Sequence, residues 1–168
     1  MVEPFLFDTV DTAVGPLTIV VDRKGSVTEL WLSDVSEKLT RNELYLRDSS
    51  AVAEGARQLV EYASGERREF DLPLAPHGSE FQHKVWDLLL EIPYGETRSY
   101  GQLAAVLGTP NGSRAVGRAN ATNPIGIIIP CHRVIGASGD LTGYGGGLPM
   151  KQKLLQLEGS LKRTLFDA

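Results

Sequence analysis

The chain contains one cysteine, Cys131, and this limits how a sequence of 168 residues can be held together. A lone cysteine can form neither an intramolecular disulfide nor a cysteine-rich zinc site, so the fold must depend on its hydrophobic core. Cys131 is followed by His132, a candidate base, and preceded by the apolar run 125–129, which can hold the pair rigidly. Two interpretations are open at this point. Cys131 is either a reactive thiol or a buried cysteine that packs as a small hydrophobic side chain.

Length and composition predict one domain or two small ones. No basic stretch followed by an apolar core marks a signal peptide at the N-terminus. No apolar run approaches the roughly 20 residues that span a bilayer. We therefore expect no membrane association and a reducing compartment: the cytoplasm of a bacterium or archaeon, or the nucleus if the host is a eukaryote.

Positive charge is concentrated in one segment of an otherwise acidic chain. The net charge is −4, yet residues 97–139 contain four arginines and no Asp, Glu or Lys, so the rest of the chain carries −8. Cationic side chains without neighbouring acids are typical of a site for a phosphate backbone. The alternative is a chance cluster of arginines on a solvated face.

The first part of the chain predicts strands and one helix. Apolar, β-branched runs separated by Gly-containing turns indicate strands, two of them paired as a hairpin. Apolar residues at helical spacing, followed by Gly65, indicate a helix. The expected elements are strands over 5–10, 17–21, 27–32 and 70–74, a loop over 33–49 and a helix over 50–63. Pro73, Pro76 and Gly78 then predict a domain boundary, which divides the chain into residues 1–76 and 77–168.

Helical signals dominate the second part of the chain. Ser79 with Gln82, and Ser99 with Gln102, have the spacing of capping boxes. The second box opens a short helix that Gly108 ends.

A further short helix is expected to begin with Thr109 as N-cap and Pro110 as its first residue, and to carry Arg114 and Arg118. Two short helices joined by a Gly-containing turn indicate a helix-turn-helix, although plain helical hairpins share this pattern. The glycine-rich stretch 136–147 lacks the lysine and the spacing of a phosphate loop. It fits better a loop that lines a flat aromatic ligand, since glycines permit close backbone approach.

Cys131 lies within a set of ordered motifs between residues 81 and 159. On these motifs the sequence resembles the O6-alkylguanine-DNA alkyltransferases, a family of DNA repair proteins that reverse damage directly. The motifs are Ile92–Thr97, Ser99–Tyr100, Ser113–Gly117, Asn123–Pro124, Pro130–Val134 and Gly143–Gly147. The resemblance implies an α/β N-terminal domain with a small antiparallel sheet. It also implies a mainly helical C-terminal domain with a helix-turn-helix, and this domain carries the DNA site and the cysteine.

The resemblance assigns roles around the cysteine. Cys131 accepts the alkyl group, His132 is its base, and Glu158 is the acid that orients the histidine. Adjacent side chains of an extended segment point in opposite directions, which favours a bridging water over direct contact between thiol and imidazole. Tyr100 supplies a proton or a hydrogen bond to the leaving guanine, and Asn123 is a hinge between the recognition helix and the active-site turn. The pocket for the extruded base is expected to be shaped by Val134, Tyr144 and Gly145.

The resemblance also assigns a DNA-binding surface. Base flipping is expected, because a base inside a duplex cannot reach a buried thiol. Arg114 matches the family's finger, which fills the space that the nucleotide leaves. The small residues Ser113 and Ala115 permit close approach to the minor groove, and Arg118 and Arg98 are expected to contact phosphates.

The expected activity is that of a methylated-DNA–protein-cysteine S-methyltransferase. The alkyl group of O6-alkylguanine, or of O4-alkylthymine, in double-stranded DNA passes once and irreversibly to Cys131. No metal or organic cofactor is expected, and the zinc of some relatives is not expected because no cysteine lies outside the active-site motif. A monomer in solution is expected, with cooperative binding to DNA left open. Two alternatives remain: a cysteine hydrolase using Cys131 and His132, and a protein that only binds damaged DNA through the helix-turn-helix.

Overall fold

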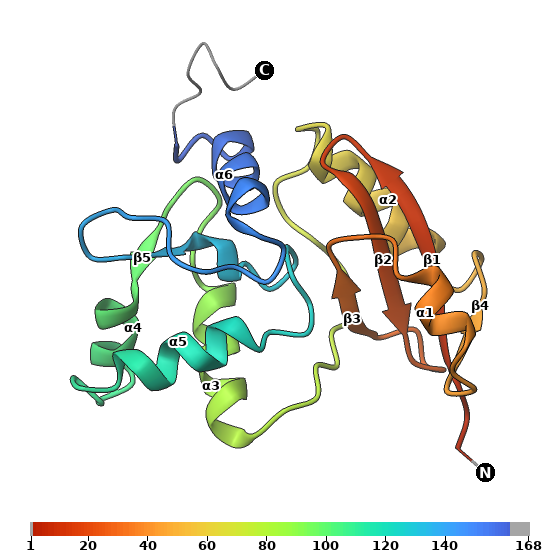
Figure 1. Ribbon diagram of the computed structural model, residues 1–168, viewed down its shortest axis with the longest axis horizontal. Coiled ribbons are helices and arrows are strands. Elements are labelled where there is room, and N and C mark those ends of the chain that lie inside the picture. The colour runs from red at the N-terminus through yellow and green to blue at the C-terminus, as the bar shows by residue number, and fades with distance from the viewer. Residues whose placement is uncertain (1, 162–168) are drawn as a thin grey trace. The chain divides into compact units, whose positions relative to one another are not determined.

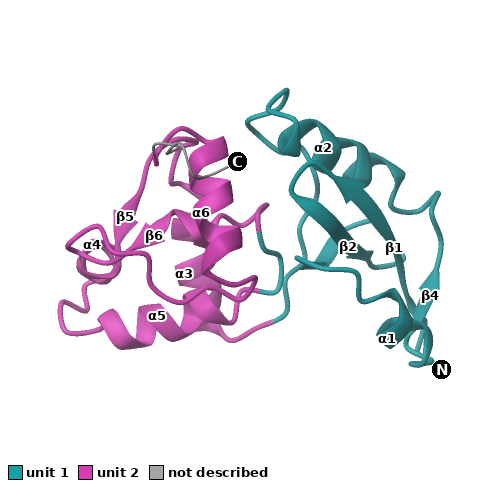
Figure 2. Ribbon diagram, turned by 45° about the horizontal axis from the view of Figure 1, so that its top comes forward, with its two compact units in different colours: residues 1–77, 124–126 teal, residues 78–123, 127–168 magenta. Residues whose placement is uncertain are grey.

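The computed structural model describes residues 2–161, which form two compact units (Figure 2). The first unit contains the chain up to His77 together with Pro124–Gly126, and the second contains the remaining described residues. The predicted domains, 1–76 and 77–168, place Pro124–Gly126 in the second half, whereas this segment lies with the first unit. The reason is a backbone contact: the N–H of Leu30 donates to the carbonyl of Pro124 at 2.9 Å.

The first unit is built on a four-stranded sheet with the strand order β3-β2-β1-β4 (Figure 1). Strands β1, β2 and β3 pair antiparallel in sequence order, and the β2–β3 pair is the predicted hairpin. Two helices accompany the sheet. The elements are β1 (Phe5–Thr12), β2 (Gly15–Val21), β3 (Val27–Trp31), α1 (Ser36–Thr40), β4 (Tyr45–Arg47) and α2 (Ala53–Ala63).

Strand β2 contributes to the core on both faces of the sheet, because its side chains alternate between them. Val20 packs with Phe7 and with Leu39 of α1. Ile19, its neighbour, contacts α2 on the other face, where a Cβ on Gly55 would meet the Ile19 side chain. Gly55 therefore allows α2 to lie close against the sheet.

Residues 33–49, which the sequence predicts as a loop, contain α1 and β4. Strand β4 pairs parallel with β1, so the sheet is mixed, and the expected antiparallel pairing holds for β1, β2 and β3. A few apolar contacts fix this segment, since Leu39 and Tyr45 both belong to the cluster around Phe7.

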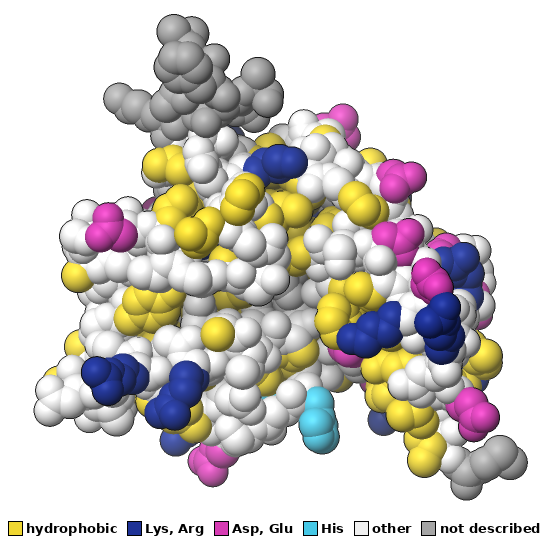
Figure 3. All heavy atoms as spheres, in the orientation of Figure 1, with side chains coloured by type: hydrophobic (Ala, Val, Ile, Leu, Met, Phe, Trp, Pro, Cys, Tyr) yellow, Lys and Arg dark blue, Asp and Glu magenta, His cyan; other side chains and the backbone are white. Residues whose placement is uncertain are grey.

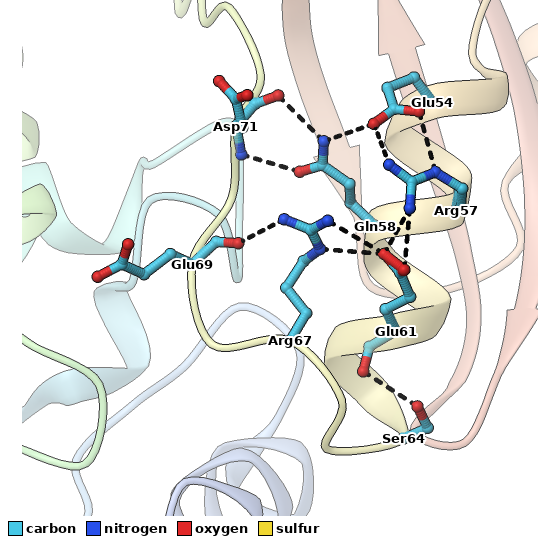
Figure 4. Close-up of polar contacts among 8 residues, drawn as sticks. All are labelled: Glu54, Arg57, Gln58, Glu61, Ser64, Arg67, Glu69 and Asp71. Atoms are coloured by element: carbon cyan, nitrogen blue, oxygen red, sulfur yellow. Dashed lines mark hydrogen bonds and ion pairs between the residues drawn. The ribbon is translucent and has the colours of Figure 1, made fainter.

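Residues 70–74, predicted as a strand, form only an isolated bridge, between Leu74 and Val27. Side chains of α2 bind the preceding backbone instead (Figure 4). The Gln58 carbonyl oxygen accepts from the Asp71 N–H at 2.9 Å, and the Gln58 amide donates to the Asp71 carbonyl at 3.0 Å. A network of ion pairs lies beside this contact, formed by Glu54, Arg57, Glu61 and Arg67.

The second unit is mainly helical. Its helices α3 and α6 both contact the short turn η1 that carries the cysteine. The indole N–H of Trp86 on α3 donates to the carbonyl of Ala119 on α5 at 2.9 Å, which joins these helices in the core. None of the helices within residues 2–161 has the length and apolarity needed to cross a membrane. The elements are α3 (Glu80–Leu90), β5 (Arg98–Ser99), α4 (Tyr100–Val106), α5 (Ser113–Ala121), the 3-10 turn η1 (Cys131–Arg133), β6 (Val134–Ile135) and α6 (Leu148–Leu157).

Both predicted capping boxes are confirmed. The Ser79 hydroxyl accepts from the Gln82 N–H while the Gln82 side chain accepts from the Ser79 N–H. Ser99 and Gln102 make the same reciprocal pair at the start of α4. The boxes fix where α3 and α4 begin.

Helix α5 begins at Ser113, later than predicted, with Gly112 as its N-cap residue. The prediction of Thr109 as N-cap and Pro110 as first helical residue is wrong. The Thr109 hydroxyl instead donates to the carbonyl of Ala104 near the end of α4, at 3.3 Å. Thr109 thus completes the preceding helix, and residues 109–112 form the turn between the two helices of the helix-turn-helix.

Candidate active site and DNA-binding helix

Cys131 is buried, with 7% of its surface exposed, and begins the turn η1. Its N–H donates to the carbonyl of Ile129 at 2.8 Å. Ile127, four residues earlier, has φ +68°, a left-handed conformation that costs a non-glycine residue about 1–3 kcal/mol. This strained residue turns the chain sharply before η1. The extended conformation assumed for the Cys131–His132 pair is therefore wrong, because the two residues lie in a 3-10 turn.

His132 is fully buried and is held by Glu158, at the C-terminal end of α6. The two side chains meet at 2.8 Å between His132 Nε2 and Glu158 Oε2. Arg133 binds the same carboxylate through two nitrogens, with Nε at 2.8 Å from Oε1 and Nη2 at 3.0 Å from Oε2. Its third nitrogen donates to the carbonyl of Ile92 at 2.7 Å. The paired guanidinium fixes the carboxylate in position behind the imidazole.

The contact with Glu158 determines which nitrogen of His132 can act as a base. A carboxylate only accepts, so Nε2 carries the hydrogen and Nδ1 holds the lone pair. Nδ1 is buried and has no hydrogen-bond partner among residues 2–161. Burial lowers the pKa of His132, with Glu158 opposing and Arg133 and Lys151 assisting that effect. The imidazole is therefore neutral at neutral pH and able to take up a proton at Nδ1.

Burial also dominates the pKa of the thiol. It raises the pKa of Cys131, while the side chain of Asn123 and the charge of Lys151 act in the lowering direction. Burial likewise raises the pKa of Tyr144 well above its usual range, with the charge of Cys131 as the next cause, and the Tyr144 hydroxyl is buried without a hydrogen-bond partner among residues 2–161. Cys131 is consequently a neutral thiol at rest, and it becomes a nucleophile only when a base removes its proton.

Two asparagines near the end of α5 bind the active-site turn. Asn123 Nδ2 donates to the carbonyl of Ile129 at 2.8 Å, which is the position expected of the predicted hinge. Asn120 Nδ2 donates to the carbonyl of Cys131 itself, at 3.3 Å. Helix α5 and the cysteine are thus coupled through two side-chain contacts.

The other residues predicted for the base pocket lie on the glycine-rich stretch and around β6. Val134, the first residue of β6, is fully buried, and its carbonyl accepts from Lys151 Nζ at 2.6 Å. The Tyr100 hydroxyl lies 2.6 Å from the Thr142 hydroxyl. The ring of Tyr144 stands edge-on to that of His132, with centroids 6.5 Å apart, whereas Gly145 is exposed.

Helix α5 presents the predicted DNA-binding residues. Arg114 and Arg118 are exposed on it, and Ser113 and Ala115 are half-buried between them and the core. Figure 3 shows basic side chains over this part of the second unit. Arg114 and Arg118 line a shallow hollow together with Gly117 and Ala121.

Two of the four arginines in the basic segment are paired with carboxylates. Arg133 is buried in its pair with Glu158, so it is not a candidate for a phosphate contact. Arg98 is partly exposed, but it pairs with Glu96 at 3.2 Å, a residue just outside the acid-free segment. The sequence of residues 97–139 therefore overstates how much unpaired positive charge lies on the surface.

Comparison with known proteins identifies the family. The family model for the DNA-binding domain of 6-O-methylguanine DNA methyltransferases matches residues 80–160. The methylated-DNA–protein-cysteine methyltransferase of Methanosarcina acetivorans is 48% identical over 155 residues, which cover 89% of this chain and 96% of the relative. That of Mycobacterium bovis is 49% identical over 165 residues, which cover 96% of this chain and 98% of the relative. The chain belongs to this family.

Solved structures agree with this assignment. The chain is similar to OGT of Mycobacterium tuberculosis in complex with DNA, with a TM-score of 0.83, 48% identity and coverage of 92% of this chain and 93% of that one. The expected family, the fold class and the enzyme class, a methylated-DNA–protein-cysteine methyltransferase, are confirmed. The reaction class is transfer of an alkyl group from DNA to a cysteine, and DNA is the partner.

Three residues of the site, Asn120, Arg133 and Lys151, were not predicted from the sequence. No local pattern shows that Asn120 will bind the carbonyl of Cys131. The same holds for Arg133, whose carboxylate partner lies at the end of another helix. Lys151 could have been found from its spacing, because it is in helical register with the core-facing residues of α6. These residues are Leu154, Leu155 and Glu158. In the structure Lys151 is fully buried.

Proposed function

We propose that the protein repairs O6-alkylguanine, and O4-alkylthymine, in double-stranded DNA by moving the alkyl group onto Cys131. The observation that carries this proposal is a single cysteine placed beside a buried His132–Glu158 pair. The relatives are protein-cysteine methyltransferases, and this chain has no thiol other than Cys131 that could accept the alkyl group. The pair supplies the base that a buried, neutral thiol requires.

The reaction begins with removal of the thiol proton. His132 Nδ1 takes the proton of Cys131 through one bridging water, and Glu158 stabilises the imidazolium that forms. The thiolate then attacks the alkyl carbon, so that a sulfur–carbon bond forms while the bond from that carbon to guanine O6 breaks. Arg133 holds the Glu158 carboxylate in its orientation during this charge separation.

The electron pair of the broken bond remains on guanine, which needs a proton or a hydrogen bond at that moment. Tyr100 supplies it from the start of α4. Val134, Tyr144 and Gly145 border the pocket that receives the base, and Asn123 holds the recognition helix to the active-site turn.

The burial of Cys131 requires that the damaged nucleotide leaves the duplex. Arg114 enters the space that it vacates, while Ser113 and Ala115 allow α5 to lie close to the minor groove. Arg118 and Arg98 contact phosphates, so the affinity for DNA falls with added salt and depends little on sequence.

The protein acts once, as a monomer in the cytoplasm. The product is a thioether on Cys131, and the chain holds no second thiol that could remove the group. Neither a metal nor an organic cofactor enters this chemistry.

Intact-protein mass spectrometry after incubation with duplex DNA containing O6-methylguanine tests the proposal. We expect every protein molecule to gain one methyl group, located on the peptide that holds Cys131, and the variant Cys131→Ala to gain none. Repeated turnover of an activated ester without a lasting mass gain would instead indicate a cysteine hydrolase. A lesion that is bound but left intact would indicate a protein that only recognises damage.

A further inference from the structure

The hydroxyl of Tyr100 has a hydrogen-bond partner in the structure. Its oxygen lies 2.6 Å from Oγ1 of Thr142, which is near the short end of the range for hydroxyl pairs. Tyr100 begins α4, whereas Thr142 lies 42 residues later in the glycine-rich stretch. Either oxygen can donate to the other. Any role of Tyr100 as a donor is therefore linked to the hydroxyl of Thr142.

Thr142 is fixed in place by contacts other than this hydrogen bond. Its carbonyl accepts from Lys151 Nζ at 3.1 Å, and the same ammonium donates to the Val134 carbonyl at 2.6 Å. Val134 belongs to β6, which pairs in parallel with β5 directly before Tyr100. These contacts form a closed ring from Tyr100 through Thr142, Lys151 and β6 back to β5. The ring holds the two hydroxyls at a set separation.

We infer that Thr142 is a positioning residue for the alkyl transfer, whose hydroxyl donates to the phenol oxygen of Tyr100 and leaves the Tyr100 hydrogen directed at the guanine. This inference rests on the proposed function. A phenol has one hydrogen, so Tyr100 can give it to the substrate only if Thr142 acts as the donor in their shared bond. A hydrogen bond to an oxygen that gains negative charge is stronger than one between neutral groups. Thr142 thus also stabilises the charge that develops on Tyr100.

The proton balance of the step is closed. The thiol proton of Cys131 passes to His132, and guanine receives a proton or a hydrogen bond from Tyr100. Where the proton is transferred, Tyr100 recovers one from solvent. Where it is only shared, the guanine anion takes its proton from solvent. In both cases His132 returns its own proton to solvent. The net change is a thiol and an alkylguanine converted into a thioether and a guanine.

Two substitutions at one position separate the hydroxyl from the packing of Thr142. Thr142→Val keeps the shape and removes the hydroxyl, whereas Thr142→Ser keeps the hydroxyl and removes the methyl group. Neither changes the carbonyl that binds Lys151. A role through the hydroxyl makes the valine variant slow and the serine variant nearly normal, and a role through packing reverses this order.

The experiment measures the single-turnover rate of methyl transfer to Cys131 from O6-methylguanine duplex DNA, together with the affinity for that DNA. We expect Thr142→Val to slow transfer about tenfold, the effect of losing one hydrogen bond to a group that becomes charged, without weakening DNA binding. Thr142→Ser should stay within about twofold of the wild-type rate. In a Tyr100→Phe background, Thr142→Val should cause no further loss.

Two results would overturn the inference. One is a valine variant as fast as the wild type, and the other is an equal loss from Thr142→Val with Tyr100 present or absent. A wild-type protein that gains no methyl group would remove the proposed function itself. That outcome is distinct, because the inference fails alone only when the wild type reacts.

Discussion

The substitution Glu158→Gln removes the charge at the centre of the site while nearly keeping the side-chain shape. The Glu158 carboxylate is fully buried and accepts hydrogen bonds from His132 and, through two nitrogens, from Arg133. A glutamine leaves the guanidinium, whose side chain is 9% exposed, without a counter-charge. Removing one partner of a buried ion pair costs about 3–5 kcal/mol. We expect Glu158→Gln to lower the free energy of unfolding of the second unit by this amount.

Urea unfolding followed by tryptophan fluorescence measures the effect. The chain has two tryptophans, Trp31 in the first unit and Trp86 in the second. Trp31→Phe makes Trp86 the sole reporter of the second unit, and it removes a buried indole N–H that has no partner among residues 2–161. The matched control in the same unit is Glu80→Gln, because Glu80 pairs with Lys84 on the surface at 3.7 Å. We expect this control to leave stability nearly unchanged.

The double variant with Arg133→Met shows whether the loss comes from the unpaired cation. Once the guanidinium is also absent, part of the lost stability should return, so the two substitutions together should cost less than their sum. A Glu158→Gln protein that unfolds like the Glu80→Gln control would refute the reasoning. It would mean that water already screens the Glu158 carboxylate.

Three further predictions concern pH, the first unit and DNA. Burial holds the pKa of His132 below its ordinary value of about 6.5, so the unfolded chain binds a proton before the folded one as the pH falls. The contribution of His132 to the free energy of unfolding is therefore complete above about pH 6.5 and is lost below it. In urea titrations at different pH values, the variant His132→Gln should lack this pH dependence. Gln58→Leu should lower the stability of the first unit by about 1–2 kcal/mol, because it leaves the N–H and carbonyl of Asp71 without their partner. Arg114→Ala should impair repair of duplex DNA far more than reaction with free O6-benzylguanine, and equal losses in the two rate assays would exclude Arg114 as the finger.

The elements that the sequence predicted correctly have local signals. Helices α3 and α4 begin at capping boxes, which need only residues three apart. The β2–β3 hairpin follows from two apolar runs and a short turn. In contrast, α1 has five residues and β4 has three, too few for any periodicity to show. The parallel pairing of β4 with β1 depends on contacts with Phe7 across the sheet, which no local pattern contains.

The site divides in the same way. The order of motifs identified Cys131, His132 and Glu158 through a family resemblance, and the structure brings the last two together across 26 residues. The direction of each arginine could not be predicted, because the partner of a charged side chain depends on the fold. Arg133 follows His132 in sequence, yet it turns inward to the same carboxylate. The composition of the segment suggests that Arg133 is a surface cation, but in the structure it is buried and paired.

The burial that makes Cys131 unreactive at rest suits the single turnover that we propose. An accessible cysteine of low pKa exists largely as the thiolate and reacts with oxidants and other electrophiles. Any such reaction would consume a molecule with no other thiol. Burial raises the pKa of Cys131 and lowers that of His132, so both the thiolate and the imidazolium are disfavoured while the protein is at rest. Under the proposed mechanism they form when an alkylated base is bound, and this ties the reactivity of the sulfur to the presence of the damaged base.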